Sequence, residues 1–257
     1  MLDTFDVTLE KLTVDQPRRA YVYVPDLAAE DPSLRFPVLY MFDGHNLFYD
    51  HHATYGKSWG FLEYMEATRT PLIIAAVECN HDPAGGRIIE YCPYTCTMPD
   101  FGLIRGKGKA TMDFFANEFK PYIDANYPTR PEREYTFLGG SSMGGLMTLY
   151  GVMRYNNVFS RGAALSPSLW FGQDKLFSML KNARVGKDTV LYMDYGRREL
   201  GFHQTMFHGL AETAAILLEK KIDLTCRVVP NGNHNEASWE KQIPFFINTL
   251  MYELPQA

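Results

Sequence analysis

The sequence predicts a single α/β domain over residues 1–257, built on a mostly parallel sheet of about eight strands with helices on both faces. Three observations carry this prediction. Strand-like and helix-like segments alternate through most of the chain, the pattern of β-α-β units. Most of the strand-like segments are short, continuous apolar runs, which is typical of strands covered on both faces. A chain of 257 residues can also bury one large core.

The first two strand-like segments, residues 5–14 and 18–26, follow each other closely and predict an antiparallel hairpin. Six further strands are expected from apolar runs, at residues 36–44, 71–79, 133–140, 160–168, 188–196 and 223–231. Helices are expected between them, at residues 59–68, 110–127, 143–155, 173–183, 203–221 and 236–254.

Two segments of this pattern have special features. In the helix expected at residues 110–127, Phe115, Phe119 and Ile123 form one apolar stripe, and Pro121 predicts a kink. Residues 80–108 are rich in glycine, proline and aromatic residues and lack a clear period. A loop of this length is usually functional or disordered, and its aromatic content favours an ordered loop over the active site.

Composition and charge exclude several classes of partner. The net charge is -5 with no acidic or basic run, which argues against nucleic acid, because phosphate binding needs a basic surface. No apolar run reaches the length of a membrane span, so no membrane association is expected. The first residues do not resemble a secretion signal, so we expect a cytoplasmic protein. The oligomeric state cannot be read from the sequence.

The four cysteines lack the spacing of a zinc site, and we expect free thiols. A disulfide between Cys92 and Cys96 stays open, but only in an oxidising compartment. The polar run Asp50-His51-His52 could ligate a metal, although an ordinary polar loop explains it as well. We therefore expect no metal and no organic cofactor.

The stretch TFLGGSSMGGLM, residues 136–147, holds the strongest signal for chemistry. A strand is expected to end here and a helix to begin, which is the setting of a nucleophile elbow. In that motif small residues stand two before and two after the nucleophile, so that strand and helix can approach closely. Gly140 and Gly144 stand in this way around Ser142, whereas Ser141 has Met143 two residues after it. Ser142 is therefore the predicted nucleophile.

A serine hydroxyl needs a base, and the base needs an orienting carboxylate. His234 follows the last expected strand, and parallel strands place such loops at the same edge of the sheet as the elbow. The acid should lie between the serine and the histidine, after a strand. Glu199, beyond the Gly196 turn, is favoured over Asp194, which falls inside the expected strand. Asp194 stays as the alternative.

Ester hydrolysis also requires donors for the negative oxygen that develops in the transition state. The backbone N–H of Met143, directly after the nucleophile, is one expected donor. The second is expected from the loop after the third strand, where Gly44 allows a sharp bend and His45 offers its N–H.

Several stretches taken together resemble the putative esterase family of α/β-hydrolases, which includes enterochelin-type esterases, feruloyl esterases and S-formylglutathione hydrolase. The resemblance runs from about residue 18 to 250 and is carried by FDGHNLF, SWG, RIIEYCPY, FKPYIDANYPT, LGGSSMGGLMTLY, FSRGAALSPSLWF, DYGRRE and GNHNEASWEKQIP. It implies an α/β-hydrolase fold without a large lid domain. It also implies that Ser142, Glu199 and His234 are nucleophile, acid and base.

The resemblance also suggests residues that contact the substrate. Trp170 would lie near the acyl pocket, although a packed core tryptophan is the alternative. Arg87 and Tyr91 would lie on the long loop over the site, although a structural pair between Arg87 and Glu90 is equally consistent with the sequence. His45 stands where similar sequences often have glutamine, which bears on substrate choice and leaves a backbone donor unaffected.

The sequence therefore predicts a serine carboxylic-ester hydrolase acting through an acyl-enzyme on a small soluble ester with a short, aromatic or sugar-linked group. Two alternatives remain at this point. The same triad could transfer the acyl group to an alcohol, or the chain could be a non-catalytic binding protein on a hydrolase fold.

Overall fold

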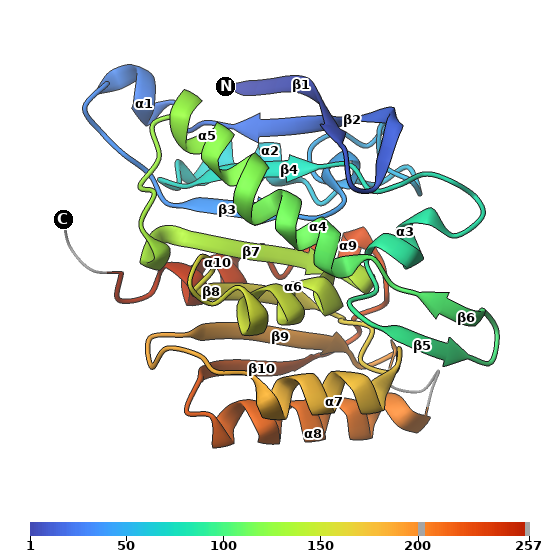
Figure 1. Cartoon of the computed structure of the whole chain (residues 1–257). Coiled ribbons are helices and arrows are strands. Elements are labelled where there is room, and N and C mark those ends of the chain that lie inside the picture. Colours follow the sequence, from blue (N-terminus) through green and yellow to red (C-terminus); the bar gives the residue numbers. More distant parts are fainter. Residues whose placement is uncertain (200–203, 255–257) are drawn as a thin grey trace.

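The computed structural model of the chain describes residues 1–199 and 204–254, and its centre is one twisted eight-stranded sheet (Figure 1). The strand order is β1-β2-β4-β3-β7-β8-β9-β10. β2 runs antiparallel to both of its neighbours, and the other pairs are parallel. The predicted eight strands and the N-terminal hairpin are therefore confirmed. The strands are β1 Leu2–Leu9, β2 Thr13–Tyr23, β3 Val38–Met41, β4 Ile73–Val77, β7 Thr136–Ser141, β8 Arg161–Leu165, β9 Val190–Gly196 and β10 Asp223–Val229.

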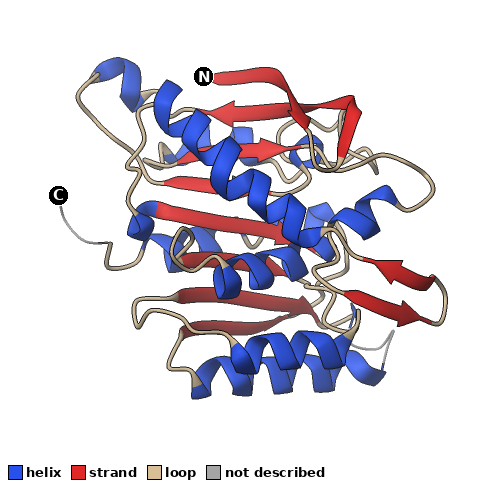
Figure 2. Ribbon diagram, viewed as in Figure 1, coloured by secondary structure: helices blue, strands red, loops and turns tan. Residues whose placement is uncertain are grey.

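Helices cover both faces of the sheet, as the alternating pattern predicts (Figure 2). On the face toward the viewer lie α4, α6 and α7, and α2, α9 and α10 cover the other face (Figure 1). The described helices are α1 Leu27–Glu30, α2 Phe61–Thr68, α3 Gly86–Glu90, α4 Gly108–Phe114, α5 Lys120–Asn126, α6 Met143–Arg154, α7 Gln173–Asn182, α8 Gln204–Glu219, α9 Glu236–Glu240 and α10 Ile243–Met251, with short turns η1 Gly44–Asn46, η2 Phe115–Phe119 and η3 Arg133–Tyr135.

Each apolar strand contributes to two separate cores because successive side chains point to opposite faces. In β3, Val38 and Tyr40 join the larger core under α4 and α6, whereas Leu39 and Met41 join the smaller core under α2 and α10. This is why the strands appear in the sequence as continuous apolar runs rather than alternating ones.

The helix expected at residues 110–127 is interrupted by the π-turn η2 at Phe115–Phe119. Pro121 is the second residue of α5, directly after this turn. Proline has no N–H and its ring crowds the carbonyl four residues back, so the widened turn absorbs what would otherwise be a kink.

Residues 80–108 form more regular structure than the sequence predicts. They contain α3 and a hairpin of β5, Thr95–Met98, with β6, Gly102–Arg105. Strands of four residues are too short to show a clear period. Cys92 and Cys96 are free thiols here, with their sulfur atoms 4.0 Å apart.

None of the described helices is long and apolar enough to cross a membrane.

Candidate active site

Ser142 occupies the tip of the turn between β7 and α6, with φ 57° and ψ −120°. A positive φ is rare for a residue with a side chain, and it persists only where the surroundings enforce it. Here the Ser142 N–H donates to the Leu165 carbonyl at 3.0 Å, and the Ser142 carbonyl accepts from Ser168 N at 3.0 Å. The N–H and the carbonyl of this strained residue are thus hydrogen-bonded to the end of β8 and to the loop that follows it.

The glycines around the elbow are required by close backbone contacts. A Cβ at Gly140 would lie 2.9 Å from the Gly144 carbonyl carbon, and a Cβ at Gly144 would lie 3.1 Å from Cβ of Phe42. At Gly145 it would lie 3.0 Å from the Leu165 carbonyl oxygen. The sequence argument about small residues on either side of Ser142 therefore has a direct steric basis.

His234 and Glu199 form a close pair at the site, with 2.7 Å between His234 Nδ1 and Glu199 Oε2. Glu199 is almost fully buried. Its other oxygen, Oε1, accepts from the Gly196 N–H at 2.8 Å and from the Ser166 hydroxyl at 2.7 Å. Trp239 Nε1 donates to that same hydroxyl at 3.0 Å, which fixes its proton toward Glu199. The Gly196 N–H, the Ser166 hydroxyl and His234 Nδ1 thus hold the Glu199 carboxylate in one orientation.

Asp194, the alternative acid, lies elsewhere. It is buried in β9, where it accepts from the Tyr192 hydroxyl at 2.7 Å and from the Ser166 N–H at 3.3 Å. Burial raises the pKa of Asp194 to about 6. The hydrogen bond of Asp194 to the Ser166 N–H stabilises the turn after β8. Asp194 makes no hydrogen bond to His234, and the structure describes both residues.

Ser142 and His234 line one cavity of about 230 Å³ at the carboxyl edge of the sheet. No hydrogen bond joins the two side chains, both of which the structure describes, and the closest recorded partner of Ser142 Oγ is Ser168 Oγ at 3.4 Å. Such hydrogen bonds are often long before substrate binds, so the arrangement is compatible with proton transfer. Three charged side chains, those of Asp43, Arg87 and Glu236, also line the cavity.

Within the described part of the chain, neither of the two expected oxyanion donors has a hydrogen-bond partner. Met143 begins α6 and His45 lies in η1, so neither N–H has a partner within its helix. Neither donates to another backbone carbonyl among the described residues. Gly44 is buried, and a Cβ there would lie 3.0 Å from the Tyr21 ring and 3.1 Å from the Val77 backbone. Gly44 therefore permits this close approach, and the left-handed residue of the bend is Asp43, with φ 57°.

Arg87 makes an ion pair across the site rather than with Glu90. Its Nε and Nη2 lie 2.7 Å from the two carboxylate oxygens of Asp43. Burial alone would raise the pKa of Asp43, but the adjacent guanidinium holds it below the usual value. Glu90 is bound by Arg18 at 2.6 and 2.8 Å. Tyr91 is buried, and its hydroxyl accepts a hydrogen bond from the Asp43 N–H at 3.3 Å. Tyr91 therefore stabilises the turn after β3 that contains Asp43.

Trp170 does not line the cavity that holds Ser142. It lines another hollow, together with Cys96, Gly172 and Lys175. Several residues of the site were not predicted from the sequence, among them Asp43, Glu236 and Ser166. Glu236 is buried in the cavity, and burial raises its pKa. The Ser166 hydroxyl donates to Glu199. Ser166 is the first residue of the Ser-Pro-Ser motif, and this motif is the feature of the sequence from which its role could have been predicted.

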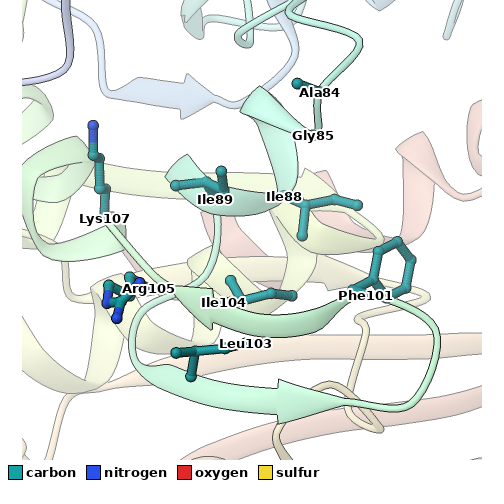
Figure 3. Close-up of a pocket in the computed structure, with 9 residues that line it drawn as sticks. All are labelled: Ala84, Gly85, Ile88, Ile89, Phe101, Leu103, Ile104, Arg105 and Lys107. Carbon is teal, nitrogen blue, oxygen red and sulfur yellow. The ribbon is translucent and has the colours of Figure 1, made fainter.

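A further hollow of about 430 Å³ lies between α3 and the β5–β6 hairpin (Figure 3). Ile88 and Ile89 of α3 face Phe101 and Ile104 across it, and Lys107 stands near one end. Its lining includes none of Ser142, His234 and Glu199. The α3 helix separates the two spaces, because Arg87 lines the first and Ile88 the second.

Comparison with known proteins identifies the family. The family model described as "Putative esterase" matches residues 12–248, nearly the whole chain. The chain belongs to the putative esterase family. As an esterase of this family it is a carboxylic ester hydrolase, which confirms the predicted enzyme class.

Relatives of this esterase are distant in sequence and close in fold. The chain is 25% identical to "Uncharacterized protein YbbA" of Bacillus subtilis (strain 168) over 249 residues, 91% of each chain. It superposes on the BES protein from Bacillus cereus with a TM-score of 0.74 at 19% identity, covering 98% of this chain and 95% of the other. An IroE-like serine hydrolase from Shewanella oneidensis gives a TM-score of 0.72 at 18% identity, covering 97% and 79%. With the strand order above, these likenesses establish the α/β-hydrolase fold.

Proposed function

We propose that this esterase is a serine hydrolase in which Ser142 attacks the ester carbonyl, His234 acts as base and Glu199 orients and charge-stabilises the histidine. The observation that carries the proposal is the 2.7 Å pair between Glu199 and His234, at the rim of the same cavity as the strained Ser142. The similarity to a serine hydrolase from Shewanella oneidensis supports it.

The geometry supports a two-step reaction. Because Glu199 Oε2 binds Nδ1–H, the Nε2 atom of His234 is left as acceptor for the Ser142 proton. The serine oxygen then bonds to the carbonyl carbon, and the carbonyl oxygen gains charge between the N–H groups of Met143 and His45. Collapse expels the alcohol, which takes the proton from His234. Water then attacks the acyl-enzyme by the same route and releases the acid.

The cavity favours a small, polar ester. A space of about 230 Å³ lies below the range of about 300–1,000 Å³ that is usual for drug-sized ligands. Arg87, Glu236 and Asn46 line it, so hydroxyl or amide groups next to the ester would find partners. We propose a short acyl group or a compact aromatic or sugar-linked one. A panel of acetyl, butyryl, feruloyl and thioester substrates tests this.

The decisive experiment compares Ser142→Ala with Ser141→Ala in the hydrolysis of p-nitrophenyl acetate. Loss of the nucleophile should lower kcat on the order of 10⁵- to 10⁶-fold. Ser141, the last residue of β7, also lines the cavity but has no role in the proposed reaction, so it serves as the matched control and should keep activity of the same order as the parent. A fluorophosphonate probe should label the control and not Ser142→Ala. Near-normal turnover by Ser142→Ala would remove the proposal, and added acceptor alcohols would reveal acyl transfer.

A further inference from the structure

The carboxyl ends of β3 and β4 bring three metal-binding side chains together. The two strands are parallel neighbours, so the segments that follow them meet at one edge of the sheet. His45 follows β3, and Cys79 and His81 follow β4. One ring nitrogen of each histidine and the Cys79 sulfur all lie within 4.8 Å of one another. Among the residues that the structure describes, Asp50, His51 and His52 form no such group.

His45 gives a second, independent observation at this cluster. Its side chain is only 5% exposed, yet its Nδ1 atom has no hydrogen-bond partner among the residues that the structure describes. The other ring nitrogen, Nε2, lies 3.0 Å from the Thr54 hydroxyl. Buried polar atoms are rarely left unpaired in native proteins. A cation bound at Nδ1 would satisfy this atom, because a neutral imidazole nitrogen is a good metal ligand.

The donor set selects the kind of cation. One thiolate and two imidazoles suit Zn²⁺ and Co²⁺, whereas Mg²⁺ and Ca²⁺ require oxygen ligands. Tetrahedral bonds of about 2.0–2.3 Å would place these donors roughly 3.3–3.6 Å apart. Since the donors lie at most 4.8 Å apart, a contraction of no more than about 1.5 Å is needed. His81 can supply much of it because its side chain is 58% exposed. Glu78 Oε2, 4.0 Å from His81 Nε2, can accept that N–H and leave Nδ1 for the metal.

We propose that His45, Cys79 and His81 form a site for a thiophilic divalent cation such as Zn²⁺, and that its occupation reversibly inhibits the esterase. On binding, the Cys79 thiol loses its proton to solvent and the sulfur forms a bond to the metal. The site lies on the wall of the catalytic cavity, since His45 and Cys79 both line it. Drawing His45 toward the metal displaces the backbone N–H that we assign to the oxyanion. Because His81 supplies much of the contraction, His45 moves by less than 1 Å, and the expected loss of rate is smaller than the ~10²-fold that a misplacement of about 1 Å can cause.

The test separates metal binding from catalysis, because only the inhibition rests on the proposed function. Binding is measured in the full chain with Ser142→Ala, by titration with Co²⁺ followed through its thiolate charge-transfer absorption and by displacement with Zn²⁺. One equivalent should bind. Cys79→Ser should abolish the thiolate band, and His81→Ala should raise the Kd at least ~10-fold. His208→Ala and Cys226→Ser, which remove an exposed histidine and an exposed cysteine, should bind as the parent does.

Inhibition is measured in the parent with p-nitrophenyl acetate. Zn²⁺ should lower activity and excess EDTA should restore it, whereas His81→Ala should keep its activity at the same Zn²⁺ concentration. The proposal is overturned if Co²⁺ gives no thiolate band, or if Cys79→Ser and His81→Ala bind Co²⁺ like the parent. If the parent shows no esterase activity while Co²⁺ still binds, the proposed function fails and the metal site stands.

Discussion

Replacing Glu199 by glutamine gives the sharpest test of the acid–base pair, because the structure fixes how the new amide must lie. Glu199 Oε1 accepts from two donors, the Gly196 N–H and the Ser166 hydroxyl. The oxygen of a glutamine amide therefore stays at this position. Its NH₂ group then replaces Oε2 and faces His234 Nδ1, which is 2.7 Å away in the parent.

This orientation places the proton of His234 on the wrong nitrogen. The NH₂ group can only donate, so Nδ1 must accept and the imidazole proton moves to Nε2. A histidine protonated at Nε2 cannot take the proton of Ser142. The carboxylate charge that offsets the developing imidazolium is lost as well. In serine proteases the equivalent change lowers kcat about 10⁴-fold, or about 5.4 kcal/mol at 1.36 kcal/mol per tenfold. We expect a loss of this order for Glu199→Gln, with little change in KM.

Asp194→Asn is the matched control. Asp194 is also buried and also lies near Ser166, but its bonds go to Tyr192 and to the Ser166 N–H. Its replacement should leave kcat of the same order as in the parent. Both variants are assayed with p-nitrophenyl acetate after thermal melts establish that they fold. The reasoning fails if Glu199→Gln stays within about tenfold of the parent, or if Asp194→Asn loses as much activity.

Three further predictions concern the support of the site. Gly140→Ala places a Cβ 2.9 Å from the Gly144 backbone, so it should lower stability by about 1–3 kcal/mol and kcat ~10²-fold, as measured by thermal melts and initial rates. Ser166→Ala leaves the Trp239 N–H without its acceptor, which should cost about 1–3 kcal/mol in urea unfolding, and the same substitution should cost less in a Trp239→Phe background, which has no indole N–H to leave unpaired. Burial raises the pKa of Asp194 from 3.8 to about 6, so between these pH values the native state holds a proton that the unfolded chain has released. The free energy of unfolding should therefore fall as pH rises through this window, and a curve for Asp194→Asn that is as steep as the parent's would contradict the assignment.

Much of the fold could be predicted from the sequence because its signals are local. The apolar runs mark strands buried on both faces, and the residues that punctuate them mark turns. The elbow could be located because the spacing of Gly140, Ser142 and Gly144 expresses a contact between segments only a few residues apart. Local signals were weakest at residues 80–108, where the elements are too short for a period and α3 is held by distant partners. One of these partners is Arg18, which binds Glu90 from 72 residues away.

The sequence by itself determined the class of fold, and it predicted Ser142 as the residue at the tip of the turn between a strand and a helix, where the structure has it. The sequence favoured Glu199 over Asp194 as the partner of His234 and kept Asp194 as the alternative, and the tertiary structure places Glu199 2.7 Å from that histidine. Asp194 and Glu199 are five residues apart and equally buried, and the choice depends on a turn in which the Gly196 N–H and the Ser166 hydroxyl hold Glu199. The same holds for the pairing of Arg87 with Asp43 and for the meeting of His45, Cys79 and His81. The physical reason is that these contacts join segments that follow neighbouring strands of the sheet but are distant from one another in the chain. No local preference of the sequence encodes such contacts.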